Sequence, residues 1–188
     1  MNICLYGASS DEIAPVYPQT IEAFGRLLAQ RGHTLVYGGG AAGLMGAAAR
    51  GVTAEGGSII GVAPRFFSAD GVLYQHCTEF VYTDTMRQRK QIMEDRSEGF
   101  VMVPGGIGTF EEFFEVLTLK QLGQHQKPIA IYNINGYFDD LEKLILHAMD
   151  EGFMQHSCKE LYAFFDDGEA LLEYLEQYRP TTGTYKKV

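Results

Sequence analysis

The sequence contains few cysteines and no long apolar run, and each shortage excludes a class of protein. Its three cysteines, Cys4, Cys77 and Cys158, are widely spaced and form no C-x-x-C pair, which argues against a disulfide framework and a structural zinc site. No apolar stretch approaches the roughly 20 residues that cross a bilayer, and the N-terminus lacks the basic and then apolar segments of a signal peptide. We therefore expect a cytoplasmic protein with no metal ion and no membrane contact.

Cations are also scarce in this chain. The 15 lysines and arginines are outnumbered by 24 aspartates and glutamates, which gives a formal net charge of −9 at pH 7. This balance disfavours nucleic acid as a partner, because a phosphate backbone requires clustered cations. A small anion needs only backbone amides and one or two local cations, so a phosphorylated small molecule remains a suitable partner.

The apolar residues, 46% of the 188, are arranged in a repeating pattern. Short apolar or β-branched runs alternate with glycine-containing turns and longer segments of helical period, which is typical of a parallel α/β sheet. The pattern predicts one Rossmann-like three-layer domain over residues 1–179, with a mostly parallel sheet of about seven strands, helices on both faces, and a flexible tail at residues 180–188.

Strands are expected at Ile3 to Tyr6, Thr34 to Tyr37, Ser58 to Val62, Phe80 to Thr83, Phe100 to Val103, Ile129 to Tyr132 and Leu161 to Phe165. Helices are expected at Pro18 to Arg31, Gly43 to Glu55, Met86 to Glu98, Phe110 to Leu122, Phe138 to Glu151 and Glu169 to Gln177. The longest irregular stretch, Pro64 to Glu79, is a loop that could cover a site.

The segment from Phe100 to Glu112 shows the strongest sign of function. A buried strand runs through Gly105, Gly106 and Gly108 into a helix, where backbone can approach a ligand closely and unpaired N–H groups face an anion. The alternative is a turn in which Thr109 is the N-cap and Glu112 its capping-box partner. Capping accounts for two residues but leaves three glycines unexplained, which favours a phosphate cradle.

A second glycine turn follows the strand that ends at Tyr37. Gly38, Gly40 and Gly43 have the spacing G-x-G-x-x-G, but the acidic residue that should follow at the end of the next strand is missing from Val62-Ala-Pro-Arg65. A dinucleotide site is therefore disfavoured. A second phosphate- or ribose-facing turn and mere close packing of helix on sheet both remain open.

Three cations, Arg87, Arg89 and Lys90, stand near the start of the helix at Met86 to Glu98. Positive charge there opposes the helix dipole unless an anion lies nearby, which suggests a ligand. The alternative is a solvated turn in which these cations pair with Asp84 or Glu94.

Weaker candidates lie elsewhere in the chain. The run Gly7-Ala-Ser-Ser10 follows the first strand, so Ser9 could reach the same crevice or simply cap the next element. The histidines show no metal-ligand spacing, and neither a G-x-S-x-G elbow nor a P-loop is present.

Together these motifs resemble the LOG ("Lonely guy") family, whose members are cytokinin riboside 5′-monophosphate phosphoribohydrolases that are often labelled lysine decarboxylases. The resemblance rests on Gly38-Gly-Gly with Gly43-Leu-Met-Gly46, on Met86-x-x-Arg89-Lys90, and on Pro104-Gly-Gly-x-Gly-Thr-x-x-Glu112. It implies hydrolysis of the N-glycosidic bond of a purine nucleoside 5′-monophosphate, without a cofactor, by a homodimer. Departures at Arg87, where the family usually has His, and at Phe66, where many plant relatives have Glu, concern the preference for the base more than the reaction.

The resemblance also implies roles for single residues. Arg89 and Glu112 correspond to the catalytic pair of the family. The remaining residues implied to bind phosphate or substrate are Ser9, Gly39, Gly40, Gly43, Met45, Lys90, Gly105, Gly106, Gly108, Thr109, Glu111 and Thr118.

Two other classes of function compete with this one. A lysine decarboxylase would need pyridoxal phosphate on a Schiff-base lysine, for which Lys90 is the best-placed candidate. A nucleotide- or cofactor-binding carrier or sensor, similar to molybdenum-cofactor carriers and SLOG domains, would keep the glycine turns without using Arg89 and Glu112 as a working pair.

Overall fold

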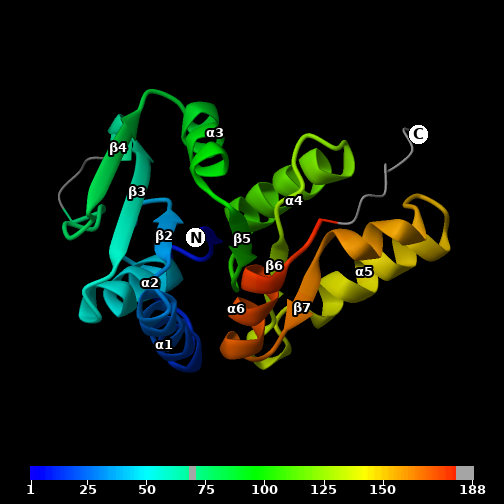
Figure 1. Ribbon diagram of the computed structural model, residues 1–188, viewed down its shortest axis with the longest axis horizontal. Coiled ribbons are helices and arrows are strands. Elements are labelled where there is room, and N and C mark those ends of the chain that lie inside the picture. Colours follow the sequence, from blue (N-terminus) through cyan, green and yellow to red (C-terminus); the bar gives the residue numbers. More distant parts are fainter. Residues whose placement is uncertain (68–70, 181–188) are drawn as a thin grey trace.

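The computed structural model describes residues 1–67 and 71–180 and shows a seven-stranded, entirely parallel sheet (Figure 1). The strand order is β4-β3-β2-β1-β5-β6-β7. The strands are β1 (Asn2–Tyr6), β2 (Thr34–Tyr37), β3 (Ser58–Pro64), β4 (Glu79–Thr83), β5 (Gly99–Met102), β6 (Ile129–Tyr132) and β7 (Ala163–Phe165). The predicted fold class is confirmed. The predicted tail lies, apart from Pro180, outside the described residues.

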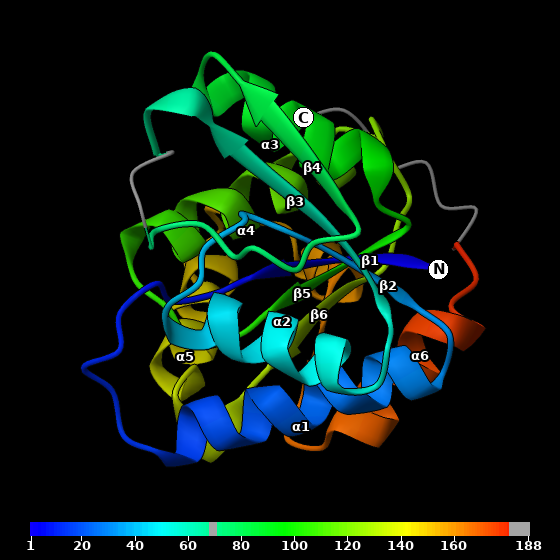
Figure 2. The same cartoon turned by 90° about the vertical axis from the view of Figure 1, so that its left-hand side faces the viewer.

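Helices cover both faces of this sheet (Figure 2). On one face are α1 (Val16–Gln30), α2 (Gly43–Ala54) and α6 (Gly168–Gln177). On the other are α3 (Met86–Arg96), α4 (Ile107–Gln121) and α5 (Asp139–Asp150). Three short 3-10 helices, η1 (Arg65–Phe67), η2 (Ile134–Gly136) and η3 (His156–Leu161), complete the described elements. Among these helices none is long and apolar enough to cross a membrane.

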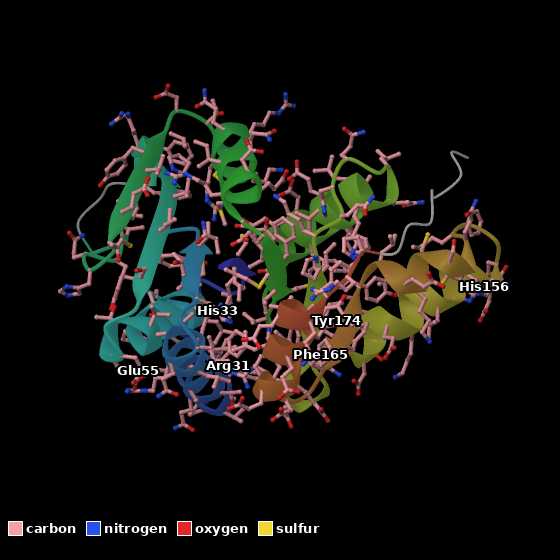
Figure 3. All side chains as sticks on the ribbon, in the orientation of Figure 1. Arg31, His33, Glu55, His156, Phe165 and Tyr174 are labelled. Atoms are coloured by element: carbon pink, nitrogen blue, oxygen red, sulfur yellow. The ribbon has the colours of Figure 1, made fainter. Side chains whose placement is uncertain are left out.

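Two apolar layers, one on each face, hold the helices to the sheet, and side chains fill the space between helices and strands (Figure 3). Successive side chains of a strand point to opposite faces, so Ile3 and Leu5 of β1 join the layer under α1 and α2, whereas Cys4 and Tyr6 join the layer under α3 and α4. All four are at most 2% exposed. Burial on both faces explains why the strands are almost continuously apolar in sequence.

Most element boundaries differ from the prediction by one or two residues, and two differences have a clear structural reason or consequence. The seventh strand starts at Ala163, because Leu161 ends the 3-10 helix η3 and its carbonyl accepts a hydrogen bond from Lys120 Nζ at 2.7 Å. Helix α4 starts at Ile107 rather than at Phe110, so Gly108 and Thr109 belong to its first turn. The second difference matters for the functional site, because it changes which residue caps the helix.

Strand β1 lies between β2 and β5. From β1 the chain builds β2, β3 and β4 on one side and then returns to build β5, β6 and β7 on the other side. In open parallel sheets the loops after the carboxyl ends of the strands part at such a switch point and leave a crevice there. The loops after β1, β2, β3 and β5 meet at this place, and they contain the glycine turns found in the sequence.

Helices α1 and α2 cross at glycines, which sets the position of α2. A Cβ atom added to Gly25 would lie 2.3 Å from the carbonyl oxygen of Ala48, and one added to Gly51 would lie 2.1 Å from that of Glu22. Both distances are far below a normal contact. The small residues of α2 are therefore required for close helix packing.

We predict that Gly25→Ala destabilises the protein, although alanine normally favours a helix over glycine. The added methyl group has to push the α2 backbone away, which should cost about 2 kcal/mol and lower Tm by roughly 5 °C. Thermal unfolding followed by circular dichroism measures this change. Ala23→Ser on the exposed face of the same helix is the control, and an unchanged Tm for Gly25→Ala would contradict the packing described here.

Candidate active site

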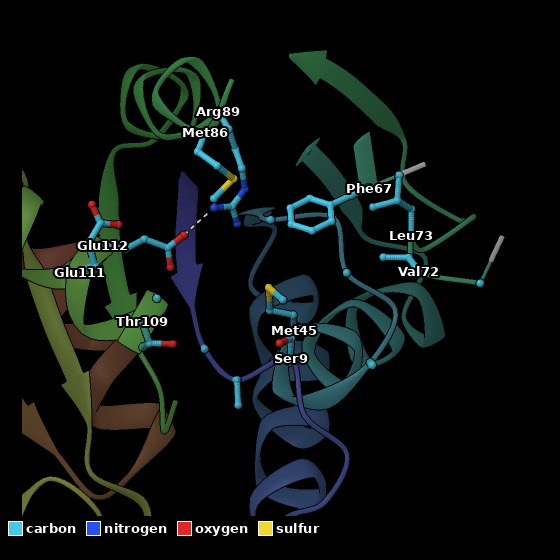
Figure 4. A pocket seen from close by; sticks show the side chains of 17 residues that line it. Ser9, Met45, Phe67, Val72, Leu73, Met86, Arg89, Thr109, Glu111 and Glu112 are labelled. Atoms are coloured by element: carbon cyan, nitrogen blue, oxygen red, sulfur yellow. Dashed lines mark hydrogen bonds and ion pairs between the residues drawn. The ribbon is translucent and has the colours of Figure 1, made fainter. Parts of the chain in front are cut away.

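A cavity of about 560 Å³ opens at the carboxyl ends of the strands (Figure 4). Its walls come from the loops after β1, β2 and β3, from η1, and from the N-terminal turns of α2, α3 and α4. The lining residues are Gly7, Ala8, Ser9, Gly38, Gly40, Ala42, Met45, Phe67, Gly71, Val72, Leu73, Met86, Arg89, Gly108, Thr109, Glu111 and Glu112.

An ion pair between Arg89 of α3 and Glu112 of α4 lies at the wall of this cavity. Arg89 Nη1 donates a hydrogen bond to Glu112 Oε1 at 2.7 Å, and the two residues are only 7% and 8% exposed. Arg89 Nε donates a second hydrogen bond to the carbonyl oxygen of Val62 at 3.2 Å. The sequence-based pairing of these two side chains is thus seen as a direct contact in the structure.

The glycine turn after β2 makes room for this arginine. A Cβ atom on Gly38 would lie 2.0 Å from Arg89 Nη2, so any other residue at position 38 would displace the guanidinium. The first glycine of the G-x-G-x-x-G spacing therefore serves the arginine rather than a dinucleotide. Gly39, with φ of +76°, faces the ring of Phe80 and does not line the cavity.

The ionisation of Glu112 reflects its surroundings. Burial raises the pKa of Glu112 above its ordinary value, and the charge and hydrogen bond of Arg89 only partly offset this rise. A carboxylate with a raised pKa, held in a cavity beside a cation, is a common arrangement in catalytic sites.

The N-terminus of α4 is open toward an anion. Its N-cap is Gly106, which offers no side-chain cap, so the capping-box alternative for Thr109 and Glu112 is wrong. Within residues 1–67 and 71–180, no acceptor is seen for the amides of Ile107, Gly108 or Thr109. The hydroxyl of Thr109 packs over the previous turn, where a Cβ on Gly105 would lie 2.1 Å from its Oγ1. These unpaired amides and the positive end of the helix form a cradle suited to an anion such as phosphate.

The N-terminus of α2 differs, because its amides are already used. Asp11 Oδ1 accepts from the Gly43 amide at 2.7 Å, and the carbonyl oxygen of Ala8 accepts from the amides of Leu44 and Met45 at 2.9 and 3.3 Å. A carboxylate at this helix end also repels a second anion. Of the two glycine turns, the one at α4 suits phosphate better.

The other cations of α3 have partners that differ from those considered in the sequence. Lys90 bonds to Glu111 Oε1 and lies 2.7 Å from Glu115 Oε2, both on α4, whereas Asp84 faces Arg65 at 3.7 Å. The pairing with Asp84 or Glu94 considered as an alternative is therefore wrong for Lys90 and Arg89. Burial and the neighbouring Glu115 raise the pKa of Glu94 to about 7.

The structure brings together most, but not all, of the expected site residues. Eight line the cavity: Ser9, Gly40, Met45, Arg89, Gly108, Thr109, Glu111 and Glu112. Six do not: Gly39, Gly43, Lys90, Gly105, Gly106 and Thr118. Gly105 and Gly106 form the turn directly before the cradle, whereas Thr118 is exposed further along α4.

One wall of the cavity is apolar and was not assigned in the sequence. Phe67, Val72 and Leu73 come from the long segment between β3 and β4, and Met86 comes from the start of α3. The bridge between Gly40 and Leu73 fixes part of this segment to the turn after β2. The sequence indicated only that the irregular stretch from Pro64 to Glu79 could cover a site, without naming these side chains. Within the described part of the chain, no group of His, Cys, Asp and Glu could hold a metal ion.

Comparisons with known proteins agree with this picture. The model of the family described as "Possible lysine decarboxylase" matches residues 45–175. Cytokinin riboside 5′-monophosphate phosphoribohydrolase LOG2 of Arabidopsis thaliana is 35% identical over 178 residues, which are 95% of this chain and 84% of that protein. The probable enzyme LOGL9 of Oryza sativa subsp. japonica is 37% identical over 178 residues, with coverage of 95% and 78%.

A solved structure supports the fold alone. The molybdenum cofactor carrier protein of Chlamydomonas reinhardtii superposes with a TM-score of 0.70 at 22% identity, covering 94% of this chain and 96% of the carrier. Proteins of this shape therefore include a carrier as well as enzymes, and the fold by itself does not give the reaction. The family match and the identity along nearly the whole chain show that this protein belongs to the LOG family, whose model is described as "Possible lysine decarboxylase".

Proposed function

We propose that this protein hydrolyses the N-glycosidic bond of a purine nucleoside 5′-monophosphate and releases the free base and ribose 5-phosphate. The base is adenine or a cytokinin-type N6-modified adenine. The observation that carries the proposal is the buried Arg89–Glu112 pair, which faces a cavity beside an uncapped helix N-terminus. The names of the relatives in Arabidopsis thaliana and Oryza sativa support the same reaction.

The cavity offers separate places for the parts of such a substrate. The amides of Ile107, Gly108 and Thr109 suit the 5′-phosphate, because they present donors at the positive end of α4. The apolar wall of Phe67 and Leu73 suits a flat purine ring, since base faces pack on apolar and aromatic side chains. The ribose then lies between these places, near Glu112.

The chemistry follows from the charge that develops on the sugar. Breaking the N-glycosidic bond builds positive charge on the ribose, so a carboxylate beside the anomeric carbon lowers the barrier and can also position the attacking water. Glu112 meets both requirements. Arg89 stays protonated and cannot act as a base, but it orients Glu112 and can bind a phosphate or ribose oxygen.

The surroundings of Lys90 speak against a Schiff-base mechanism. Burial lowers its pKa, but the ion pairs with Glu111 and Glu115 more than offset this and raise the pKa of Lys90 above its usual value. A lysine that attacks a carbonyl needs a depressed pKa. A carrier function is the remaining alternative, and binding of AMP without turnover would favour it.

Assembly and location are further parts of the proposal. We propose a homodimer, as implied by the resemblance to the family, and a cytoplasmic location. On α4, Phe113 is buried in the core, whereas Ile107 and Phe114 of the helix and its C-cap Leu122 are 89%, 39% and 65% exposed. Exposed apolar side chains on one helix are consistent with a contact surface between two copies.

We predict that Arg89→Ala and Glu112→Gln each lower kcat/KM for AMP or N6-isopentenyl AMP by about 10²- to 10⁴-fold, because each removes electrostatic stabilisation of the transition state. Chromatographic detection of the released base measures the rate. Arg96→Ala and Glu151→Gln, outside the cavity, are the matched controls. Full activity of both Arg89→Ala and Glu112→Gln would refute the assignment.

We also predict that the acid limb of the plot of kcat against pH has its midpoint above 4.5, the ordinary pKa of a glutamate. The reaction needs the carboxylate form, so activity is present above the raised pKa of Glu112 and is lost as the pH falls through it. A bound phosphate can only raise this pKa further. Adenosine 5′-sulfate, whose sulfate does not ionise in this range, separates the Glu112 step from ionisation of the substrate. An acid limb at or below pH 4.5 would contradict the prediction.

A further inference from the structure

The chain that follows β6 reaches back to the phosphate cradle through one side chain. The hydroxyl of Tyr137 donates a hydrogen bond to the carbonyl oxygen of Gly105 at 2.7 Å, across 32 positions in sequence. Gly105 directly precedes Gly106, the N-cap of α4. All described cavity-lining residues precede position 113, so this bond joins the cradle to a part of the described chain that does not line the cavity.

An unusual backbone turn directs Tyr137 to this place. Asn135 has φ of 54° and ψ of 32° and is the one non-glycine with positive φ in residues 1–67 and 71–180. Gly136 follows with φ of 69°. Such residues are held in place by their surroundings, and here Asn133 does so: its Oδ1 accepts from the Phe138 amide at 2.7 Å. The backbone is therefore constrained before Tyr137 by the turn at Asn135 and Gly136, and after it by the hydrogen bond of the Phe138 amide.

The bond has a direct consequence for the cradle because of peptide geometry. The carbonyl of Gly105 and the amide of Gly106 belong to one planar, trans peptide, so they point in opposite directions. Holding the carbonyl toward Tyr137 therefore fixes the Gly106 N–H on the far side. Neither glycine has a side chain that could fix this plane. A hydrogen bond to the carbonyl also polarises the peptide and makes the N–H a stronger donor.

The preceding peptide is held in a similar way. The Ala8 amide donates to the carbonyl oxygen of Pro104 at 3.1 Å. Two successive carbonyls are thus bound, one by the loop after β1 and the other by Tyr137. Within the described residues, the Gly106 amide has no acceptor of its own, which leaves it free for a ligand.

We propose that Tyr137 is a positioning residue for phosphate binding, acting through the Gly105–Gly106 peptide. The inference rests on the proposed function in so far as the ligand carries a phosphate. Tyr137 orients the Gly106 amide toward the phosphate and does not touch the reacting atoms. Loss of its hydroxyl weakens the binding of substrate and transition state to the same extent, so it raises KM and leaves kcat nearly unchanged.

The ring of Tyr137 has contacts that do not need the hydroxyl. It packs edge-on against Tyr17 of α1 at a centroid distance of 6.1 Å and against Phe138 at 4.9 Å. Tyr137→Phe therefore removes the hydrogen bond and keeps the packing. Tyr17→Phe is a matched control, because it removes a hydroxyl from the neighbouring ring and leaves the bond to Gly105 in place.

The experiment uses the full chain and measures the binding of ribose 5-phosphate by calorimetry, together with KM and kcat for AMP. We expect Tyr137→Phe to raise Kd and KM by roughly 3- to 10-fold, the range for one lost hydrogen bond, and to change kcat less than about twofold. Tyr17→Phe should behave as the unaltered protein. In ¹H–¹⁵N spectra, the Gly106 amide should shift in Tyr137→Phe and respond less to ribose 5-phosphate.

The outcomes separate this inference from the proposed function. If ribose 5-phosphate binds more weakly to Tyr137→Phe but AMP is never hydrolysed, the positioning role stands and the hydrolase proposal fails. If AMP is hydrolysed and Tyr137→Phe keeps the Kd and KM of the unaltered protein, the positioning role is overturned and the hydrolase proposal stands. Equal weakening in Tyr17→Phe, or no binding of ribose 5-phosphate by the unaltered protein, also overturns the positioning role.

Discussion

The buried ion pair between Arg89 and Glu112 is the constraint on which the site depends. Removing two charges from water costs several kcal/mol of desolvation free energy. Their attraction offsets this cost only if the geometry is good and other polar groups form further hydrogen bonds with them. Here the carbonyl of Val62 supplies one more hydrogen bond, and the missing side chain of Gly38 supplies the space. Because such a pair contributes little to stability, its place at a cavity wall is better explained by the chemistry of the cavity.

The two glycine turns show how similar sequences serve different purposes. At α2, the amides are taken by Asp11 and by the carbonyl of Ala8, so that turn packs the helix against the loop after β1. At α4, the N-cap Gly106 has no side chain to accept a hydrogen bond, and within the described residues the first amides of the helix have no acceptor. A glycine turn indicates that the backbone there approaches another group closely. Only the hydrogen bonds show whether the neighbour is protein or ligand.

Much of the fold could be predicted, because apolar strands and glycine turns alternate regularly along the chain. The pairing of Arg89 with Glu112 was inferred from motif resemblance and is a direct contact in the structure. The partner of Lys90 could not be foreseen, because Glu115 lies on another helix and the contact depends on how the two helices pack. The capping alternative for Thr109 is wrong, and spacing alone could not show this because it does not reveal that the helix begins at Ile107. Tyr137 was missed because its effect passes through a backbone carbonyl.

Every described residue that lines the cavity lies within the first 112 positions, whereas one half of the sheet is completed later in the chain by β6 and β7. Ligand recognition and the burial of that half are therefore encoded in largely separate stretches of sequence. Substitutions in α5, η3 and α6 are constrained chiefly by core packing, so these elements can diverge among relatives while the ligand-facing surface is retained. A chain built in this way can change its outer helices, and the contacts they make with other molecules, without first rebuilding its binding site.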